Sequence, residues 1–213
     1  MTGFDPETDE VSLHDAAIIY RAGRWRRLEA RTLDAFAVGV DGAALAEAAA
    51  LFKVARLFPG EKGSKDKRAG LLAPIAPMLE EAAQGLTAEN LTVRVQELSD
   101  RLKAQPKLVR ISDKDKPFST ISPCSKFLWC MRPEIGIIYD ERAREALSRK
   151  QSKVSLGDYS GFVEAFREEF RRRGAELDEV LPLLGALADR PWMKAKLLDF
   201  WLYTNGKLAA EVR

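Results

Sequence analysis

Histidine and cysteine are scarce in this chain of 213 residues. It has one histidine, His14, and two cysteines, Cys124 and Cys130. Zinc sites usually need four such side chains in two closely spaced pairs, whereas these cysteines are six positions apart and point to different faces of a helix. We therefore expect no metal site. A single histidine also disfavours a Ser–His or Cys–His catalytic pair.

Long apolar runs and a strong net charge are also missing. No apolar run approaches the roughly 20 residues that cross a bilayer, and the acidic first ten residues do not fit a targeting leader. With so few cysteines, we expect a cytoplasmic protein that is not bound to a membrane. The 34 Lys and Arg nearly balance the 32 Asp and Glu, so any nucleic-acid binding must depend on local patches.

The composition favours helices. Hydrophobic residues make up 46% of the chain, and Ala and Leu are interspersed with Arg, Glu and Lys, all of which form helices readily. We predict an all-α protein, a compact orthogonal bundle of about eight to ten short helices with little or no sheet. A polar tail, 1–11, precedes a single helical domain, 12–213, or two lobes that meet near 105–118. Short strands are conceivable only at 108–111 and 135–139.

Several helix ends are marked by local signals. Ser12 with Asp15 resembles a capping box, and Asp41-Gly42 is a turn and cap before an Ala-rich helix over 43–58. Thr87 is expected to cap a helix that runs to about residue 104. Pro191 is expected to start a last apolar helix, which Asn205-Gly206 would end.

Two basic segments are candidates for DNA contacts. The loop 60–70 is rich in glycine and lysine but lacks the order of residues in a nucleotide-binding loop, and the connector 107–118 is also basic. Exposed amides and lysine side chains can approach phosphates closely. The alternative is a solvated loop. The candidate DNA-binding residues are Lys62, Lys65, Lys67, Arg68, Lys107, Arg110, Lys114 and Lys116.

The segment 125–140 is the most distinctive part of the sequence. Lys126 is placed on a helix face away from the apolar stripe, and Asp140 follows an extended apolar stretch at a helix start. Free backbone N–H groups and the helix dipole stabilise a carboxylate there. The alternative interpretation makes Asp140 a helix cap and Lys126 a surface residue.

This segment also carries a resemblance. Ser-Lys-Phe-Leu at 125–128, Ile-Tyr-Asp at 138–140, Tyr159 and Leu-Leu-Asp-Phe-Trp at 197–201 resemble bacterial proteins distantly similar to the helix-hairpin-helix DNA glycosylases. The resemblance covers mainly residues 119–206. It implies that Lys126 attacks the sugar carbon and that Asp140 supports the developing positive charge. The family's glycine-rich hairpin turn is missing before Lys126, which favours DNA binding over catalysis.

Two Leu-Phe pairs suggest a different class of function. Leu51-Phe52 and Leu57-Phe58 resemble the short anchor by which bacterial proteins dock on the replicative sliding clamp, although the usual leading glutamine is missing. The alternative to DNA binding is thus a non-enzymatic interaction protein. One example is a bacterial toxin that arrests replication through the clamp and is held by an antitoxin. Helical spacing instead explains Leu51 and Phe52 as core residues.

One acidic residue lies in an otherwise apolar helix. Asp199 is flanked by leucines and aromatics, but Lys196 precedes it by three positions, so we expect a structural ion pair. The sequence predicts no cofactor. DNA and a protein are the partners that it suggests.

Overall fold

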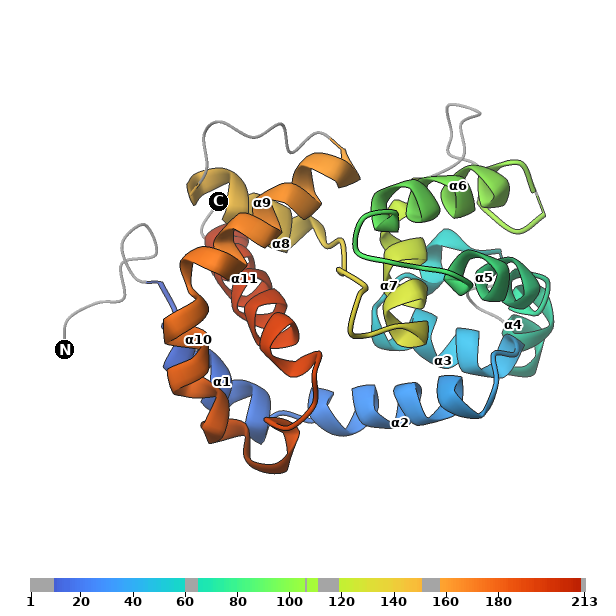
Figure 1. The fold of residues 1–213 in the computed structure, drawn as a ribbon. Helices are drawn as coiled ribbons and strands as arrows, with labels where there is room; N and C mark the ends of the chain where they lie inside the picture. The colour runs from blue at the N-terminus through green and yellow to red at the C-terminus, as the bar shows by residue number, and fades with distance from the viewer. Residues whose placement is uncertain (1–9, 60–64, 106, 111–118, 151–157, 212–213) are drawn as a thin grey trace. The chain divides into compact units, whose positions relative to one another are not determined.

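The computed structural model of the chain describes residues 10–59, 65–105, 107–110, 119–150 and 158–211. These residues form eleven α-helices and two 3₁₀ helices and contain no strand (Figure 1). The all-α prediction is confirmed, with slightly more helices than the eight to ten expected. The described residues of 108–111 and 135–139 are turns and irregular backbone rather than strands.

The chain divides into two compact units. The first combines residues 1–26 with 139–213, and the second comprises residues 27–138. The boundaries therefore do not lie in the predicted connector 105–118, whose described residues belong to the second unit. The helix α2 (Trp25–Val38) begins at the end of the first stretch and continues into the second unit.

In the first unit, the long C-terminal helix packs against most of the other elements. Figure 1 shows α8 alongside α11, and α11 also contacts α1, α10 and η2. The unit contains α1 (Leu13–Ala22), α8 (Glu141–Lys150), α9 (Tyr159–Arg172), α10 (Gly174–Val180), the 3₁₀ helix η2 (Leu181–Leu187) and α11 (Met193–Glu211).

In the second unit, α7 takes the central place and contacts α3, α5 and α6. Every side chain from Pro123 to Cys130 in this helix is buried, which is typical of a helix surrounded by others. The unit contains α3 (Gly42–Leu51), the 3₁₀ helix η1 (Ala55–Leu57), α4 (Lys65–Leu72), α5 (Ile75–Ala83), α6 (Leu91–Lys103) and α7 (Ile121–Met131).

The predicted helix caps at Ser12 and Asp41 are confirmed. The Asp15 amide donates to Ser12 Oγ at 3.0 Å, and the Ala44 amide donates to Asp41 Oδ1 at 2.8 Å. The prediction of a cap at Thr87 is wrong, because α6 begins at Leu91. The amide of Thr87 instead donates to Asn90 Oδ1 at 2.8 Å, which makes a turn before the helix.

Two predicted helices end elsewhere. The helix expected over 43–58 stops at Leu51, because Lys53 takes a left-handed φ of 56° and the chain continues as η1. The last helix begins at Met193 and continues through Asn205 and Gly206 to Glu211. Among the helices described, none has the length and apolarity needed to span a membrane.

Candidate functional site

The predicted catalytic lysine is buried within the second unit. Lys126 is 4% exposed, and its ammonium donates to Ser122 Oγ at 3.0 Å, one turn earlier in α7. The expectation that Lys126 lies on a solvent-facing side of the helix is wrong, because α7 is covered all round. Its long alkyl stem packs into the core while its ammonium stays hydrogen-bonded.

The predicted catalytic aspartate is a helix cap in the first unit. Asp140 is half-buried, its Oδ1 accepts a hydrogen bond from the Arg142 amide at 3.0 Å, and its carbonyl accepts one from the Arg144 amide at 2.9 Å. These contacts fit the capping interpretation at the start of α8. Asp140 and Lys126 therefore belong to different units, and each is supported by its own local contacts.

The two Leu-Phe pairs contribute to the core of the second unit. Leu51 and Phe58 are buried, whereas Phe52 and Leu57 are half-buried. Phe58 stacks on Phe127 with ring centroids 6.1 Å apart. The prediction that Phe58 is presented to a partner is therefore wrong, since 1% of its surface is exposed. Phe52 meets Trp129 edge to face at 6.0 Å, which agrees with the core interpretation of the first pair.

The predicted DNA-binding residues fall into three groups. Lys62, Lys114 and Lys116 lie outside the described residues, and so does the side chain of Lys65. Lys67 is exposed and Arg68 is half-buried on α4. Lys107 and Arg110 are exposed on the segment that follows α6.

The structure adds two cations that the sequence reading overlooked. The Arg110 amide donates to the Leu57 carbonyl at 3.0 Å, and Arg110 Nη1 donates to the Arg56 carbonyl at 3.3 Å. These bonds join the segment around η1 to the segment after α6. Lys53 and Arg56 are both exposed on the first of these segments. We call the four residues Lys53, Arg56, Lys107 and Arg110 the basic edge.

The basic edge is built on apolar anchors. Val54 is buried between Lys53 and Arg56, and Phe58 is buried just after Arg56. Leu108 and Val109 are buried between Lys107 and Arg110. The polar side chains are thereby directed outward while the backbone is held in place. Neither 51–59 nor 102–110 contains an aspartate or glutamate. The absence of acidic residues from both segments is visible in the sequence and could have identified the basic edge.

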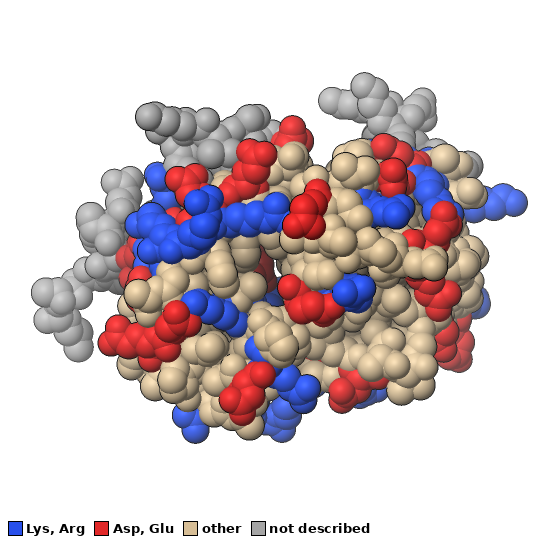
Figure 2. Space-filling view, viewed as in Figure 1, with Lys and Arg blue, Asp and Glu red and all other residues tan. Residues whose placement is uncertain are grey.

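The face of the molecule shown in Figure 2 has mixed charge. Figure 2 shows Lys and Arg side chains interleaved with Asp and Glu over the face in view. The ion pairs of described residues confirm this mixture, for example Arg31 with Glu47 at 2.9 Å and Arg101 with Glu81 at 2.8 Å. The expected ion pair between Lys196 and Asp199 is confirmed at 2.8 Å inside α11.

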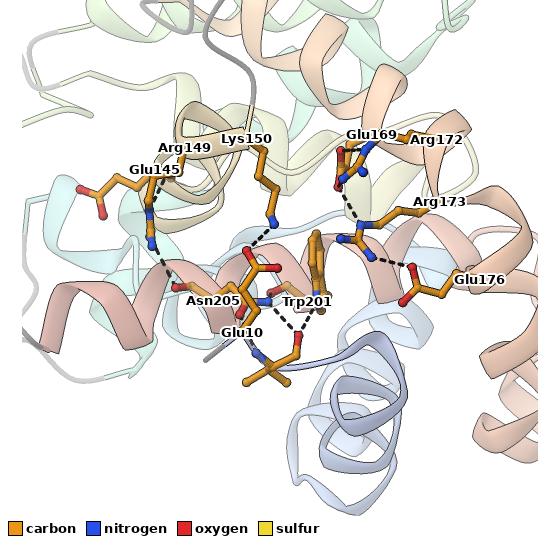
Figure 3. A network of polar contacts seen from close by, with 11 residues as sticks. Glu10, Glu145, Arg149, Lys150, Glu169, Arg172, Arg173, Glu176, Trp201 and Asn205 are labelled. Carbon is orange, nitrogen blue, oxygen red and sulfur yellow. Dashed lines mark hydrogen bonds and ion pairs between the residues drawn. The ribbon is translucent and has the colours of Figure 1, made fainter. Parts of the chain in front are cut away.

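A polar network in the first unit holds the start of α1 against the last helix (Figure 3). The Val11 amide donates to Asn205 Oδ1 at 2.9 Å, and the Val11 carbonyl accepts from Trp201 Nε1 at 2.6 Å. The Glu10 carboxylate pairs with Lys150. The predicted polar tail therefore becomes structured before residue 12.

The same network contains a fully buried carboxylate. Glu169 accepts bidentate hydrogen bonds from Arg172 at 2.6 and 2.8 Å and one from Arg173 at 2.8 Å. The Arg173 guanidinium also lies 4.1 Å from the ring centroid of Trp201. Burial raises the pKa of Glu169, but the arginine hydrogen bonds outweigh it and hold the pKa below its usual value of 4.5. Arg173 Nη1 also donates to Glu176 Oε2 in α10, so the network joins α9, α10 and α11.

Among the described residues, no three His, Cys, Asp or Glu side chains gather in a way that would hold a metal ion. Comparison of the chain with models of protein families, with curated proteins and with solved structures found no match.

Proposed function

We propose that this protein binds DNA through the phosphate backbone, with the basic edge as its contact surface. One observation carries the proposal. Two segments that lack acidic residues are joined by the hydrogen bond between the Arg110 amide and the Leu57 carbonyl, and together they carry four exposed cations. Lys and Arg bind phosphate oxygens and release the counterions around DNA, which is the main source of affinity that does not depend on sequence.

The chemistry of the basic edge fits positioning on the backbone rather than reading of bases. Its polar groups are ammonium and guanidinium groups on loops and on the three-residue 3₁₀ helix η1, and neither segment offers a helix long enough to enter a major groove. Lys107 and Arg110 were predicted DNA-binding residues, whereas Lys53 and Arg56 extend the surface. The expected binding is therefore tolerant of sequence.

The proposal is limited to binding. The glycosylase-like reaction requires an amine that reaches a sugar carbon, and the 4% exposure of Lys126 does not favour this. The sliding-clamp alternative requires an exposed anchor, which the 1% exposure of Phe58 does not favour. Neither has an observation of its own on the described residues that would support it.

Salt dependence of DNA affinity tests the proposal. With the full chain and a fluorescent duplex of random sequence, anisotropy should reveal binding at low salt. Four phosphate contacts predict a slope of about −3.6 for the logarithm of the affinity constant against the logarithm of salt concentration. Changing Lys53, Arg56, Lys107 and Arg110 together to Gln should remove most of that slope and weaken binding at low salt at least about a hundredfold.

A matched control separates the basic edge from net charge. The quadruple change of Arg24, Arg27, Arg171 and Arg190 to Gln removes the same charge from other exposed positions. It should retain most of the affinity and the slope. The proposal is refuted if the native chain binds no duplex at low salt, or if both quadruple variants lose binding equally.

A further inference from the structure

Helix α1 carries exposed aliphatic side chains on its solvent side. Leu13, Ala16, Ala17 and Tyr20 are buried in the core of the first unit. Ile18 and Ile19, however, are 47% and 46% exposed. Ala22 lies three and four positions after them and Asp15 lies three and four positions before, so these side chains share one face, which is apolar from Ile18 onward. Large β-branched residues that are grouped and exposed often mark an interaction site.

A shallow pocket of about 520 Å³ lies beside this face. It is lined by Ile18, Arg21, Ala22, Arg26 and Leu183, all of which belong to the first unit. Arg21 Nη1 donates to the Leu183 carbonyl at 3.0 Å, which ties the wall formed by η2 to α1. The lining thus combines aliphatic side chains with two guanidinium groups and includes no carboxylate.

We propose that this pocket is a docking site for an acidic amphipathic helix of a partner protein. An aliphatic side chain of that helix would enter the pocket against Ile18 and Leu183, in the way that helices dock into grooves. Glutamates on either side of it would pair with Arg21 and Arg26, because guanidinium groups bind carboxylates through paired hydrogen bonds.

The charge of the lining decides the class of partner. A basic helix would bring its lysines against two arginines, which costs free energy. A nucleic acid would satisfy the arginines but leave Ile18 and Ile19 against a phosphate backbone. The acidic helix is the occupant that satisfies both kinds of group. This site lies in the first unit and the basic edge lies in the second, so the inference does not depend on DNA binding.

A pair of designed peptides tests the proposal on the full chain. Each has about 16 residues, since shorter helices are marginal in water. One carries leucines along one face with flanking glutamates, and the other has lysines in place of the glutamates. By fluorescence anisotropy, the glutamate peptide should bind the native chain at least about tenfold more tightly than the lysine peptide.

Two substitutions at exposed or half-exposed positions should change this binding. Ile18→Asp should weaken the glutamate peptide about tenfold, because it removes an apolar contact and adds a repelling charge. Arg26→Glu should reduce the preference for the glutamate peptide or reverse it. Val93→Asp changes an exposed valine of the second unit, 55% exposed, and should leave binding unchanged.

Thermal unfolding of each variant should match that of the native chain, because these side chains are not in the core. No binding of the glutamate peptide by the native chain would overturn the proposal. Equal binding of both peptides would also overturn it, and so would insensitivity to Ile18→Asp and Arg26→Glu in variants that remain folded.

Discussion

At the scale of single residues, the stability that Glu169 contributes depends on its arginine partners. Glu169 is fully buried, and two arginines neutralise it. Breaking a buried charge pair usually costs more free energy than forming it provides, because the remaining charge is left without compensation. Its contribution to stability also depends on pH, because its pKa in the folded state is lowered.

Replacement of Glu169 by Gln should therefore destabilise the protein in a pH-dependent way. A lowered folded-state pKa contributes stability above the usual value of 4.5, and that stability is lost as the pH falls through the folded-state pKa. We expect Glu169→Gln to lower the free energy of unfolding by about 2 kcal/mol near neutral pH. The difference from the native chain should shrink as the pH falls below 4.5.

Urea unfolding measured over a series of pH values checks this prediction. Glu164→Gln, at an exposed position of the same helix, is the matched control and should change stability by less than about 0.5 kcal/mol. A Glu169→Gln variant whose deficit does not vary with pH would contradict the proposed role of the ionised carboxylate.

Residue contacts within one helical turn were predictable from the sequence. The caps at Ser12 and Asp41 and the ion pair of Lys196 with Asp199 depend on spacings of three residues, which local patterns reveal. The burial of Lys126 was not predictable in this way, because it depends on helices that are distant in sequence and cover every face of α7. The burial of Glu169 has the same cause, although its ion pairs with Arg172 and Arg173 lie within one helical turn.

At the scale of elements, glycine fixes how closely two helices approach. In α11, a Cβ on Gly206 would lie 1.9 Å from the Arg142 carbonyl oxygen at the start of α8. In α4, a Cβ on Gly70 would meet no atom within 4 Å. Both glycines lie inside helices, so both lose the same intrinsic helix propensity relative to alanine.

Alanine at these two positions should therefore have opposite effects. Gly70→Ala should stabilise the protein by about 0.5–1 kcal/mol, the gain in helix propensity. Gly206→Ala should destabilise the protein by about 1–3 kcal/mol, because α8 and α11 must move apart to admit the added methyl group. Thermal and urea unfolding of the two variants measure this difference directly, and a stabilised Gly206→Ala variant would contradict the close packing.

Gly206 also explains why the end of the last helix was mispredicted. Asn followed by Gly usually ends a helix, and by local signals that prediction was reasonable. In the structure, Asn205 uses its side chain to bond the backbone of Val11, and Gly206 admits the backbone of α8. Both contacts involve residues more than 60 positions away, so the sequence near the end of the helix does not reveal them.

At the scale of the whole molecule, the fold class followed from composition, but the division of the chain did not. The first unit joins the N-terminal 26 residues to residues 139–213. Contacts between distant parts of a chain leave no trace in local composition. The basic connector at 105–118 is visible in the composition, but it is not where the units divide. The two segments of the basic edge likewise meet only through folding, by the bonds of Arg110 to residues 56 and 57.

The two cysteines report on the integrity of the second unit. Cys124 and Cys130 are 0% and 3% exposed, both on the central helix α7. Burial raises the pKa of the Cys124 thiol, which further suppresses the reactive thiolate. A thiol reagent can therefore reach them only when the packing around α7 opens.

We expect the native chain to react with a disulfide reagent such as 5,5′-dithiobis(2-nitrobenzoate) far more slowly than an unfolded chain. Urea favours states that expose more surface, so it should raise the population of the state in which α7 is open. The labelling rate should rise in proportion to that population. Full denaturation should make both thiols reactive. The variant Val38→Cys is the control, because its added thiol is at a position 92% exposed and should react without any unfolding. Rapid labelling of Cys124 and Cys130 in the absence of urea would mean that α7 is not enclosed. It would then also contradict the packing of Phe58 on Phe127, which anchors η1 and the basic edge to α7.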